Sequence, residues 1–181
     1  MARRSSTAKK HRIEGPKRVT VAIVTVSDTR TFKTDESGRM IEELLIAKGH
    51  KVVRHGLCLD DPSRIEKELK ASLATGCNVI IFSGGTGIAP RDITVETVTP
   101  KLEKRIDGFG ELFRQLSYRD IGSAAMLSRA MAGIINGVVI FCLPGSPNAA
   151  RLAMDELILP ELGHIVGLSR LGTTTTTPGR N

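Results

Sequence analysis

Aromatic side chains are nearly missing from this chain. Its 181 residues include no tryptophan, one tyrosine and five phenylalanines. Proteins that bind single-stranded nucleic acid commonly stack bases on aromatic rings, so this composition argues against a nucleic-acid partner. The hydrophobic share of 40% must come mainly from Val, Ile, Leu and Ala. An aliphatic interior of this kind is typical of parallel strands packed between helices.

Cysteine is also scarce, and long apolar runs are missing. Cys58, Cys77 and Cys142 are widely spaced and form no Cys-x-x-Cys or Cys/His cluster. The spacing suggests neither a disulfide framework nor a zinc site, and favours buried free thiols in a reducing compartment. No run approaches the roughly 18 to 20 apolar residues that cross a bilayer. We therefore expect a cytoplasmic protein without a membrane partner.

Positive charge is in excess, with a formal net charge of +7, but it is unevenly placed. Residues 1–18 hold seven of the 26 basic residues and a single acidic one, Glu14, so the rest of the chain is nearly neutral. We expect a basic disordered tail at 1–17; contact with RNA, an acidic partner or a neighbouring subunit is the alternative. A Thr-rich flexible tail is expected at 169–181, which leaves one domain at 18–168.

The first half of the chain alternates apolar strands with amphipathic helices. The pattern predicts strands at 19–26, 51–58 and 78–82, and helices at 36–48, 62–73 and from Asp92 through Glu96. Short joins between these elements favour an α/β fold, a three-layer α-β-α domain around a mostly parallel sheet. The second half is less periodic; helices are expected at 108–118 and 148–157, and a strand at 137–143.

A glycine-rich loop follows the third predicted strand. Gly84, Gly85, Thr86 and Gly87 come directly after the strand, and Arg91 and Asp92 precede the next helix. Without Cβ atoms, backbone N–H groups can approach an anion closely, and a helix N-terminus beside them favours negative charge. Arg91 adds a cation for phosphate, and Asp92 a carboxylate for Mg²⁺. The loop is predicted to bind phosphate; the alternative is a sharp turn that merely needs glycine.

Other polar turns follow the remaining strands. Ser27 and Asp28 end the first strand, Asp60 and Asp61 the second, and Pro144, Gly145 and Ser146 the last. In parallel sheets, ligands bind at the carboxyl ends of the strands, so these turns are candidates for one common site.

Six motifs, taken in order, resemble a known family. They are Val26-Ser27-Asp28, Asp60-Asp61, Gly84 to Gly87 with Arg91-Asp92, Gly108-Phe109-Gly110-Glu111, Met126-Leu127-Ser128-Arg129 and Leu143-Pro144-Gly145-Ser146-Pro147. Together they are similar to the MoaB/MogA family of molybdenum-cofactor biosynthesis proteins, which is related to the G domains of plant Cnx and animal gephyrin. The resemblance covers about residues 19–164.

The resemblance implies a fold and an activity. Family members have an α/β, molybdopterin-binding fold and form homotrimers or homohexamers. Active members are molybdopterin adenylyltransferases: they bind molybdopterin and Mg²⁺-ATP, join AMP to the pterin phosphate and release pyrophosphate. The attacking phosphate oxygen is already ionised, so the reaction needs charge neutralisation and alignment more than a strong base.

The resemblance also assigns roles to residues. Asp60 and Asp92 match the catalytic aspartates, which would hold Mg²⁺, while Gly84, Gly85, Thr86, Gly87 and Arg91 would bind nucleotide phosphates. The pterin side is expected to include Ser27, Asp28, Ser117, Ser128, Pro144, Gly145 and Ser146.

Each assignment has a structural alternative. Asp60 or Asp61 could be only a helix N-cap, and the sequence does not decide which of the two faces the metal. Asp92 could cap its helix and also bind metal. Ser128, expected within a helix, could bond its own i−4 carbonyl.

Two further functions compete with the adenylyltransferase. One is a catalytically silent molybdopterin-binding or assembly protein on the same fold. The other makes the basic tail the functional element, which would bind RNA in a strongly salt-dependent manner.

Overall fold

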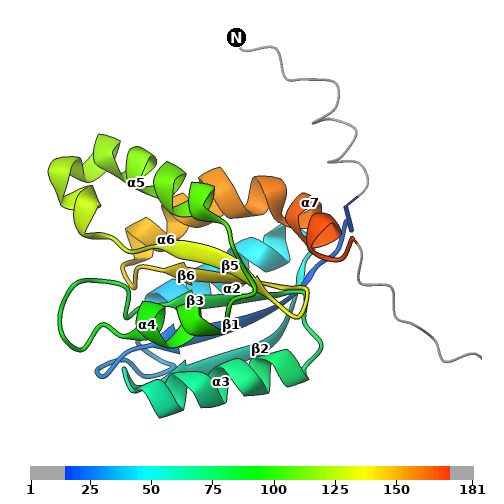
Figure 1. Ribbon diagram of the computed structural model, residues 1–181, viewed down its shortest axis with the longest axis horizontal. Helices are drawn as coiled ribbons and strands as arrows, with labels where there is room; N and C mark the ends of the chain where they lie inside the picture. The colour runs from blue at the N-terminus through cyan, green and yellow to red at the C-terminus, as the bar shows by residue number, and fades with distance from the viewer. Residues whose placement is uncertain (1–14, 172–181) are drawn as a thin grey trace, which may run out of the picture.

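A six-stranded sheet forms the centre of the protein (Figure 1). The computed structural model describes residues 15–171. The strands are β1 (Thr20–Val26), β2 (Lys51–Cys58), β3 (Val79–Ser83), β4 (Lys104–Arg105), β5 (Met131–Ile135) and β6 (Val138–Leu143), in the order β2-β1-β3-β6-β5-β4. β2, β1, β3 and β6 are parallel, and β5 is antiparallel to both β6 and β4. The predicted α/β fold around a mostly parallel sheet is confirmed.

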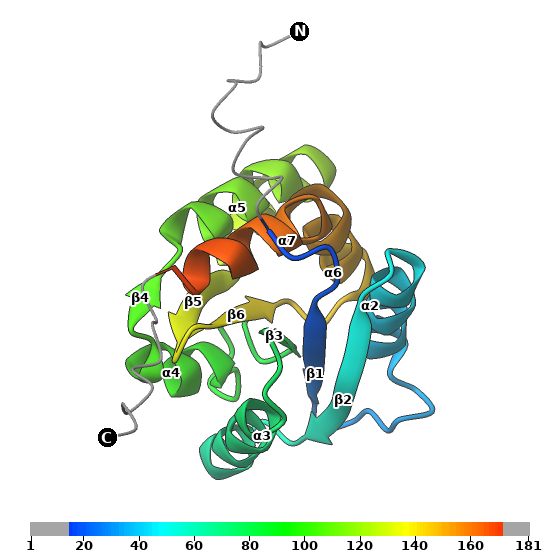
Figure 2. The ribbon, with the colours of Figure 1, turned by 90° about the vertical axis from the view of Figure 1, so that its right-hand side faces the viewer.

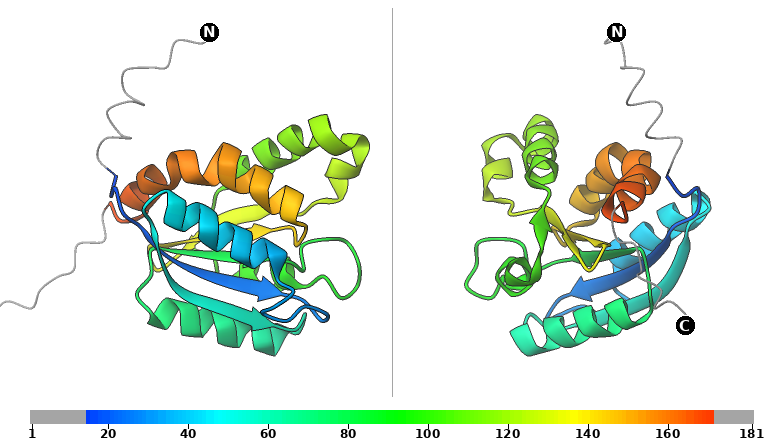
Figure 3. Two further views of the ribbon diagram at one scale, coloured as in Figure 1. Left: turned by 180° about the vertical axis from the view of Figure 1, so that it is seen from behind. Right: turned by 45° about the vertical axis from the view of Figure 1, so that its right-hand side comes forward.

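Helices cover both faces of the sheet (Figure 2). One face carries α2 (Glu36–Ala47), α5 (Asp107–Ile121), α6 (Pro147–Ala153) and α7 (Leu159–Ser169); the other carries α3 (Pro62–Ala74) and α4 (Thr94–Val98). The two views of Figure 3 show the same three layers from behind and obliquely. No helix within residues 15–171 is long and apolar enough to span a membrane.

The central strands are apolar on both faces because both faces are buried. Along β1, Val21 and Ile23 belong to the core under α2 and α7, whereas Ala22 and Val24 belong to the core over α3. Alternate side chains of a strand point to opposite faces, so a strand between two helical layers reads as a continuous apolar run. This property explains why the predicted strands of the first half agree with the structure to within two residues, and the predicted helices, including the one after the glycine loop, agree equally well.

The second half departs from the sequence-based expectations. The predicted strand at 137–143 is β6, but it is the second arm of a hairpin whose first arm, β5, was not predicted. The turn consists of Asn136 and Gly137, both with positive φ (49° and 73°), the backbone of a two-residue hairpin turn. The pairing of β4 with β5 was not predicted either.

The last helical segment is longer than predicted. A helix was expected at 148–157, whereas helical structure runs from Pro147 to Ser169 through a π-helical turn, Met154–Ile158. Pro160 follows that turn and has no N–H to donate, and the widened π turn absorbs the missing bond without ending the helix.

Most of both predicted tails lies outside the described residues. Of the N-terminal tail predicted at 1–17, residues 15–17 are described, and the backbone of Gly15 lies directly against Gly163 of α7. Of the C-terminal tail predicted at 169–181, residues 169–171 are described; Ser169 ends α7 and its hydroxyl donates to Gly137 O at 2.9 Å.

Candidate active site

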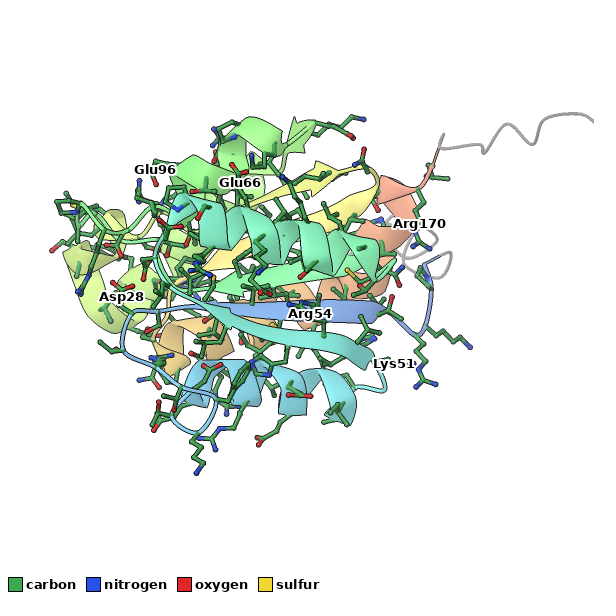
Figure 4. The ribbon with its side chains drawn as sticks, turned by 90° about the horizontal axis from the view of Figure 1, so that it is seen from below. Asp28, Lys51, Arg54, Glu66, Glu96 and Arg170 are labelled. Carbon is green, nitrogen blue, oxygen red and sulfur yellow. The ribbon has the colours of Figure 1, made fainter. Side chains whose placement is uncertain are left out.

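The carboxyl ends of four parallel strands meet at one edge of the sheet. From β1 the chain leaves to β2 on one side, and after β2 it crosses to β3 on the other side of β1. This reversal of strand order between β1 and β3 is where open α/β sheets bind ligands. Figure 4 shows Asp28 and Glu96 at this end of the molecule, with Lys51 and Arg170 at the opposite end.

Two glycines hold the loop after β3 in backbone conformations that other residues avoid. Gly84 has φ +117°, and a Cβ on it would collide with the carbonyl oxygen of Val26. Gly85 has φ +63°, and a Cβ there would lie 2.5 Å from Asp60 Oδ1. Glycine is therefore required both by backbone conformation and by the close approach of β1 and Asp60.

Thr94 braces this loop from the start of α4. Its hydroxyl donates to Gly84 O at 2.9 Å, and its backbone N–H donates to Gly85 O at 3.0 Å. Gly84 and Gly85 are therefore fixed by hydrogen bonds to Thr94 as well as by their place at the end of β3.

The expectation that Asp92 caps the following helix is wrong. α4 begins at Thr94, and its N-cap, Ile93, makes no side-chain capping bond. Asp92 instead closes the turn before the helix: its N–H donates to Ala89 O (2.8 Å), and its carboxylate accepts from Ala89 N–H (2.9 Å). Pro90 favours this turn because it presets φ at the second turn position.

The two aspartates after β2 have different surroundings. Asp61 is the N-cap of α3 and accepts from Arg64 N–H at 3.0 Å. Asp60 faces the glycine loop, and its buried Oδ1 has no hydrogen-bond partner among the described residues. The alternatives left open by the sequence are thereby separated, because Asp61 caps the helix, whereas the Asp60 carboxylate lies against Gly85 of the glycine loop.

Three carboxylates influence one another at this edge. Burial raises the pKa of Asp60 to about 6, and the negative charges of Asp28 and Asp92 add to the rise, while Arg91 opposes it. Asp28 is fixed by the backbone, since its Oδ1 accepts from Asp60 N–H at 3.1 Å. A carboxylate that resists ionisation beside two others is suited to binding a cation.

Arg129 clamps the far end of the glycine loop. Its guanidinium donates to Gly87 O and to Asp92 O, each at 2.7 Å, and forms an ion pair with Glu96. The pairing lowers the pKa of Glu96. The Arg129 guanidinium therefore fixes the loop that carries Asp92. The cation that acts on Asp60 is instead the exposed Arg91.

A hollow of about 320 Å³ brings most of the predicted site together. It is lined by Gly84, Gly85, Thr86, Gly87, Asp92, Ser128, Pro144, Gly145 and Ser146. A larger hollow of about 820 Å³ between α4, α5 and β5 also includes Ser128 in its wall. Ser128 therefore lies where two spaces adjoin.

Ser128 is not within an α-helix, contrary to the sequence-based expectation. It follows a 3₁₀ segment, Gly122–Leu127, with extended backbone, and its Oγ accepts from Ala130 N–H at 3.4 Å. The segment is built from small residues and begins at Gly122 with φ +60°, a conformation that interrupts the α-helix before it.

Five predicted residues do not line the smaller hollow: Asp60 and Arg91, described above, and Ser27, Asp28 and Ser117. Ser27 turns its hydroxyl to its own loop, where it accepts from Thr29 and Arg30 N–H groups. Asp28 bonds the neighbouring loop, as described above. Ser117 is buried on α5 and is absent from the lining residues.

A partly buried polar cluster beside Gly145 was not predicted. It consists of Thr25, Arg30, Asp35, Ser37, Glu42 and His55, which come from β1, the loop after it, α2 and β2. The sequence held one signal for it: Asp35 stands directly before α2 as an N-cap residue. The contact with His55, 20 residues further on, has no local signal.

Together these features define an α/β protein with a glycine-rich loop and a group of carboxylates at the switch point of its sheet. A family model described as a probable molybdopterin binding domain matches residues 22–164. A protein of Bacillus cereus named molybdenum cofactor biosynthesis protein B is 52% identical over 157 residues, which is 86% of this chain and 93% of that protein. The Bacillus subtilis protein of the same name is 43% identical, covering 88% and 95%.

Solved structures give the same result. A crystal structure of a molybdenum cofactor biosynthesis protein B has a TM-score of 0.83 and 51% identity, covering 86% of this chain and 98% of that one. A tungsten cofactor synthesizing protein MoaB from Pyrococcus furiosus has a TM-score of 0.79 and 39% identity, covering 86% and 99%. The chain belongs to the MoaB/MogA family of molybdenum cofactor biosynthesis proteins.

Proposed function

We propose that this protein is a molybdopterin adenylyltransferase that uses Mg²⁺-ATP. The observation that carries the proposal is the orphaned Oδ1 of Asp60, which is buried directly behind Gly85 without a hydrogen-bond partner among the described residues. A buried carboxylate oxygen without a donor is unfavourable unless a proton or a cation supplies one. If the neighbouring glycine loop binds phosphate as predicted, Mg²⁺, which commonly accompanies substrate phosphates, is the cation that fits this place.

The donor set fits Mg²⁺ held jointly with substrate. Within residues 15–171, no group of three or more His, Cys, Asp or Glu is arranged to hold a metal ion by itself. Mg²⁺ keeps several waters and commonly takes one or two carboxylates together with substrate phosphates. Asp60 and Asp92 would supply those carboxylates, and the ion when bound would neutralise charge on the phosphates.

The chain's own residues would then align the two phosphates. Gly85, Thr86 and Gly87 line the hollow with backbone and one short side chain, so peptide N–H groups can contact the nucleotide phosphates. An oxygen of the pterin phosphate attacks the α-phosphorus of ATP, and the bond from that phosphorus to the β-phosphate oxygen breaks, so pyrophosphate leaves. Arg91 would offset the charge that the oxygens carry.

The pterin side of the ligand would extend from Ser128 and the Pro144–Ser146 turn. These residues line the same hollow as the glycine loop, and Ser128 borders the larger space beside it. A ligand longer than a phosphate can therefore occupy both. The three cysteines are free and buried, which suits a protein working in the reducing cytoplasm.

Pyrophosphate release from Mg²⁺-ATP and molybdopterin tests the proposal. Wild-type protein is expected to turn over, and Asp92→Asn to lose about a hundredfold or more, because Asn keeps an oxygen for Ala89 N–H but removes the charge. Asp155→Ala, an exposed aspartate on the last helical segment, is the control and keeps full activity.

Two other outcomes are informative. Molybdopterin binding without turnover in the wild type would replace the enzyme with the silent binding protein of the same fold. If the wild type shows no molybdopterin binding and no turnover, both the enzyme and the silent binding protein are refuted.

We also propose that the protein forms a homo-oligomer through α5 and the 3₁₀ segment after it. Large apolar side chains are exposed there: Leu112 (50%), Tyr118 (64%), Ile121 (59%), Met126 (75%) and Leu127 (45%). A patch of this kind is unusual on a monomer. Sedimentation velocity is expected to give a trimer or hexamer, which the double substitution Ile121→Glu, Met126→Glu converts to smaller species; a monomeric wild type would refute the assembly.

A further inference from the structure

Asp35 is a fully buried carboxylate at the N-cap of α2. Its Oδ1 accepts from Gly38 N–H at 2.9 Å, and its Oδ2 accepts from the Thr25 hydroxyl at 2.6 Å and from His55 Nε2 at 3.1 Å. Burial raises the pKa of Asp35, but the bonds from His55, Thr25 and Gly38 outweigh burial and lower it to about 2. The carboxylate is therefore ionised and tied to three elements.

His55 lies between two carboxylates. Its Nε2 is 3.1 Å from Asp35 Oδ2, and its Nδ1 is 3.1 Å from Glu42 Oε2. A neutral imidazole carries only one N–H, so only the imidazolium can donate to both carboxylates. The bond to Asp35 raises the pKa of His55, burial lowers it, and Glu42 raises it further. The ring of Phe32 covers the imidazole edge-on, with centroids 5.9 Å apart.

A chain of polar contacts leads from this pair to the ligand hollow. Arg30 Nη1 lies 3.7 Å from Asp35 Oδ1 and donates to the Ser37 hydroxyl. Because the Ser37 oxygen accepts from Arg30, its single hydrogen is available to a second acceptor. The Gly145 carbonyl oxygen lies 3.2 Å from Ser37 Oγ, nearer than Asp35 Oδ1 at 3.5 Å, and takes that hydrogen.

Gly145 transmits the contact to the glycine loop. A Cβ on Gly145 would lie 3.3 Å from Gly84 Cα, so the two backbones are packed together. Gly84 N–H also donates to Leu143 O at 2.9 Å, just before the Pro144–Ser146 turn. A shift of this turn would therefore change the width of the hollow.

We propose that the His55 imidazolium is a positioning residue for the ligand cleft, which it acts on through Asp35, Arg30 and Ser37 to hold the Pro144–Ser146 turn against the glycine loop. The positive imidazolium and guanidinium together balance Asp35 and Glu42, so the cluster is complete only when His55 carries both protons. The proposal rests on the proposed function for the identity of the ligand, while the positioning itself can be measured without any ligand.

Amide hydrogen exchange, followed by NMR on the full chain, tests the positioning. The reporters are the N–H of Gly84, bonded to Leu143 O, and the N–H of Ala150, bonded to Ser146 O; Ile65 N–H, bonded to Asp61 O on α3, is the internal reference. We expect His55→Gln and Ser37→Ala each to speed exchange at both reporters about tenfold, since each interrupts the chain of contacts that leads to Gly145. His164→Gln, whose imidazole pairs with Glu161 on α7, is the matched control and leaves both reporters unchanged.

The pH dependence distinguishes positioning from general loosening. Corrected for intrinsic chemistry, exchange at the two reporters should rise in the wild type as pH increases above 6.5 through the raised pKa of His55, and lose this dependence in His55→Gln. The same rise should appear at lower pH in Glu42→Gln, because one of the two partners that raise the pKa is gone.

Activity adds a readout that a merely structural role would not move. In the adenylylation assay, His55→Gln and Ser37→Ala should raise KM for molybdopterin several-fold with a smaller change in kcat. Altered exchange without wild-type turnover would refute the enzyme and leave the positioning intact. Unchanged reporter exchange in Ser37→Ala, which removes a single oxygen, would overturn the positioning even if His55→Gln does not fold.

Discussion

Asp60→Asn is expected to reduce turnover about a thousandfold while making the protein more stable. The Asp60 carboxylate is held in a place that disfavours its charge, beside Asp28 and Asp92 and partly buried, and its pKa is raised to about 6. Asn has nearly the same shape and no charge, so it relieves the repulsion but no longer attracts a cation.

The sign of the pH dependence follows from the raised pKa. Between pH 3.8, the value for an ordinary Asp, and about 6, the folded protein binds more protons at Asp60 than the unfolded chain does. The free energy of unfolding therefore falls as pH rises through this window, and the loss persists above it. After allowance for solvent screening of a partly exposed group, we expect Asp60→Asn to recover about 1 kcal/mol at pH 7.5 and to remove this part of the pH dependence.

Urea denaturation at pH 4.5 and 7.5, with pyrophosphate release at neutral pH, measures both effects. Asp61→Ala is the matched control one residue away, because it removes the N-cap bond to Arg64 N–H and lies outside the cleft. It should lose stability and keep activity, the reverse of Asp60→Asn. An Asp60→Asn protein that is both less stable and active would contradict this account of the carboxylate.

Among Gly→Ala substitutions at the described residues, Gly84→Ala is expected to lower the free energy of unfolding most, by about 3 to 5 kcal/mol. Two costs add at this position: φ is +117°, and the new Cβ would collide with the backbone oxygen of Val26, which cannot rotate away as a side chain could. Because Val26 ends β1, the collision can be removed only if the end of β1 and the glycine loop move apart.

Two other glycines separate the two costs. Gly76 has φ +68° with nothing within 4 Å of a Cβ, so Gly76→Ala should cost only the backbone part, about 1 kcal/mol. Gly108 lies in α5 with open space around it and should gain about 0.5 to 1 kcal/mol on replacement by Ala. Urea midpoints of the three variants test the order, and a Gly84→Ala loss no larger than that of Gly76→Ala would exclude the collision.

The strands and helices of the first half could be predicted because each is specified locally. β1 and β3 are apolar on both faces, and α3 begins with an aspartate followed by Pro62 at its first position. The β5–β6 hairpin was missed although its signal was present: Asn136-Gly137 between two apolar runs is a typical two-residue turn. No element was predicted for residues 132–135, and the predicted strand was confined to 137–143.

The sequence was sufficient to predict which loops meet at the candidate site, but not the contacts between their residues. Strand topology is sufficient to bring Asp60, the glycine loop and the Pro144–Ser146 turn to one edge, and the structure does bring them there. The individual hydrogen bonds could not be predicted from the sequence. The Asp92 carboxylate accepts from Ala89 N–H instead of capping a helix, and the Arg129 guanidinium donates to the carbonyl oxygen of Gly87 in the loop. The His55–Asp35 contact depends on how β2 sits beside α2, which no local pattern encodes.

The strand order also has a consequence for the protein during synthesis. β3 receives its second neighbour only when β6 has been made, and the turn that completes the ligand hollow follows β6 at residues 144–146. A nascent chain that ends before β6 leaves the backbone N–H and C=O groups along one edge of β3 unpaired, and unpaired strand edges promote misassembly. Ligand cannot stabilise such an intermediate, because the cleft does not yet exist. Translation must therefore pass Ser146 before a ligand can stabilise the folded chain by binding in the hollow.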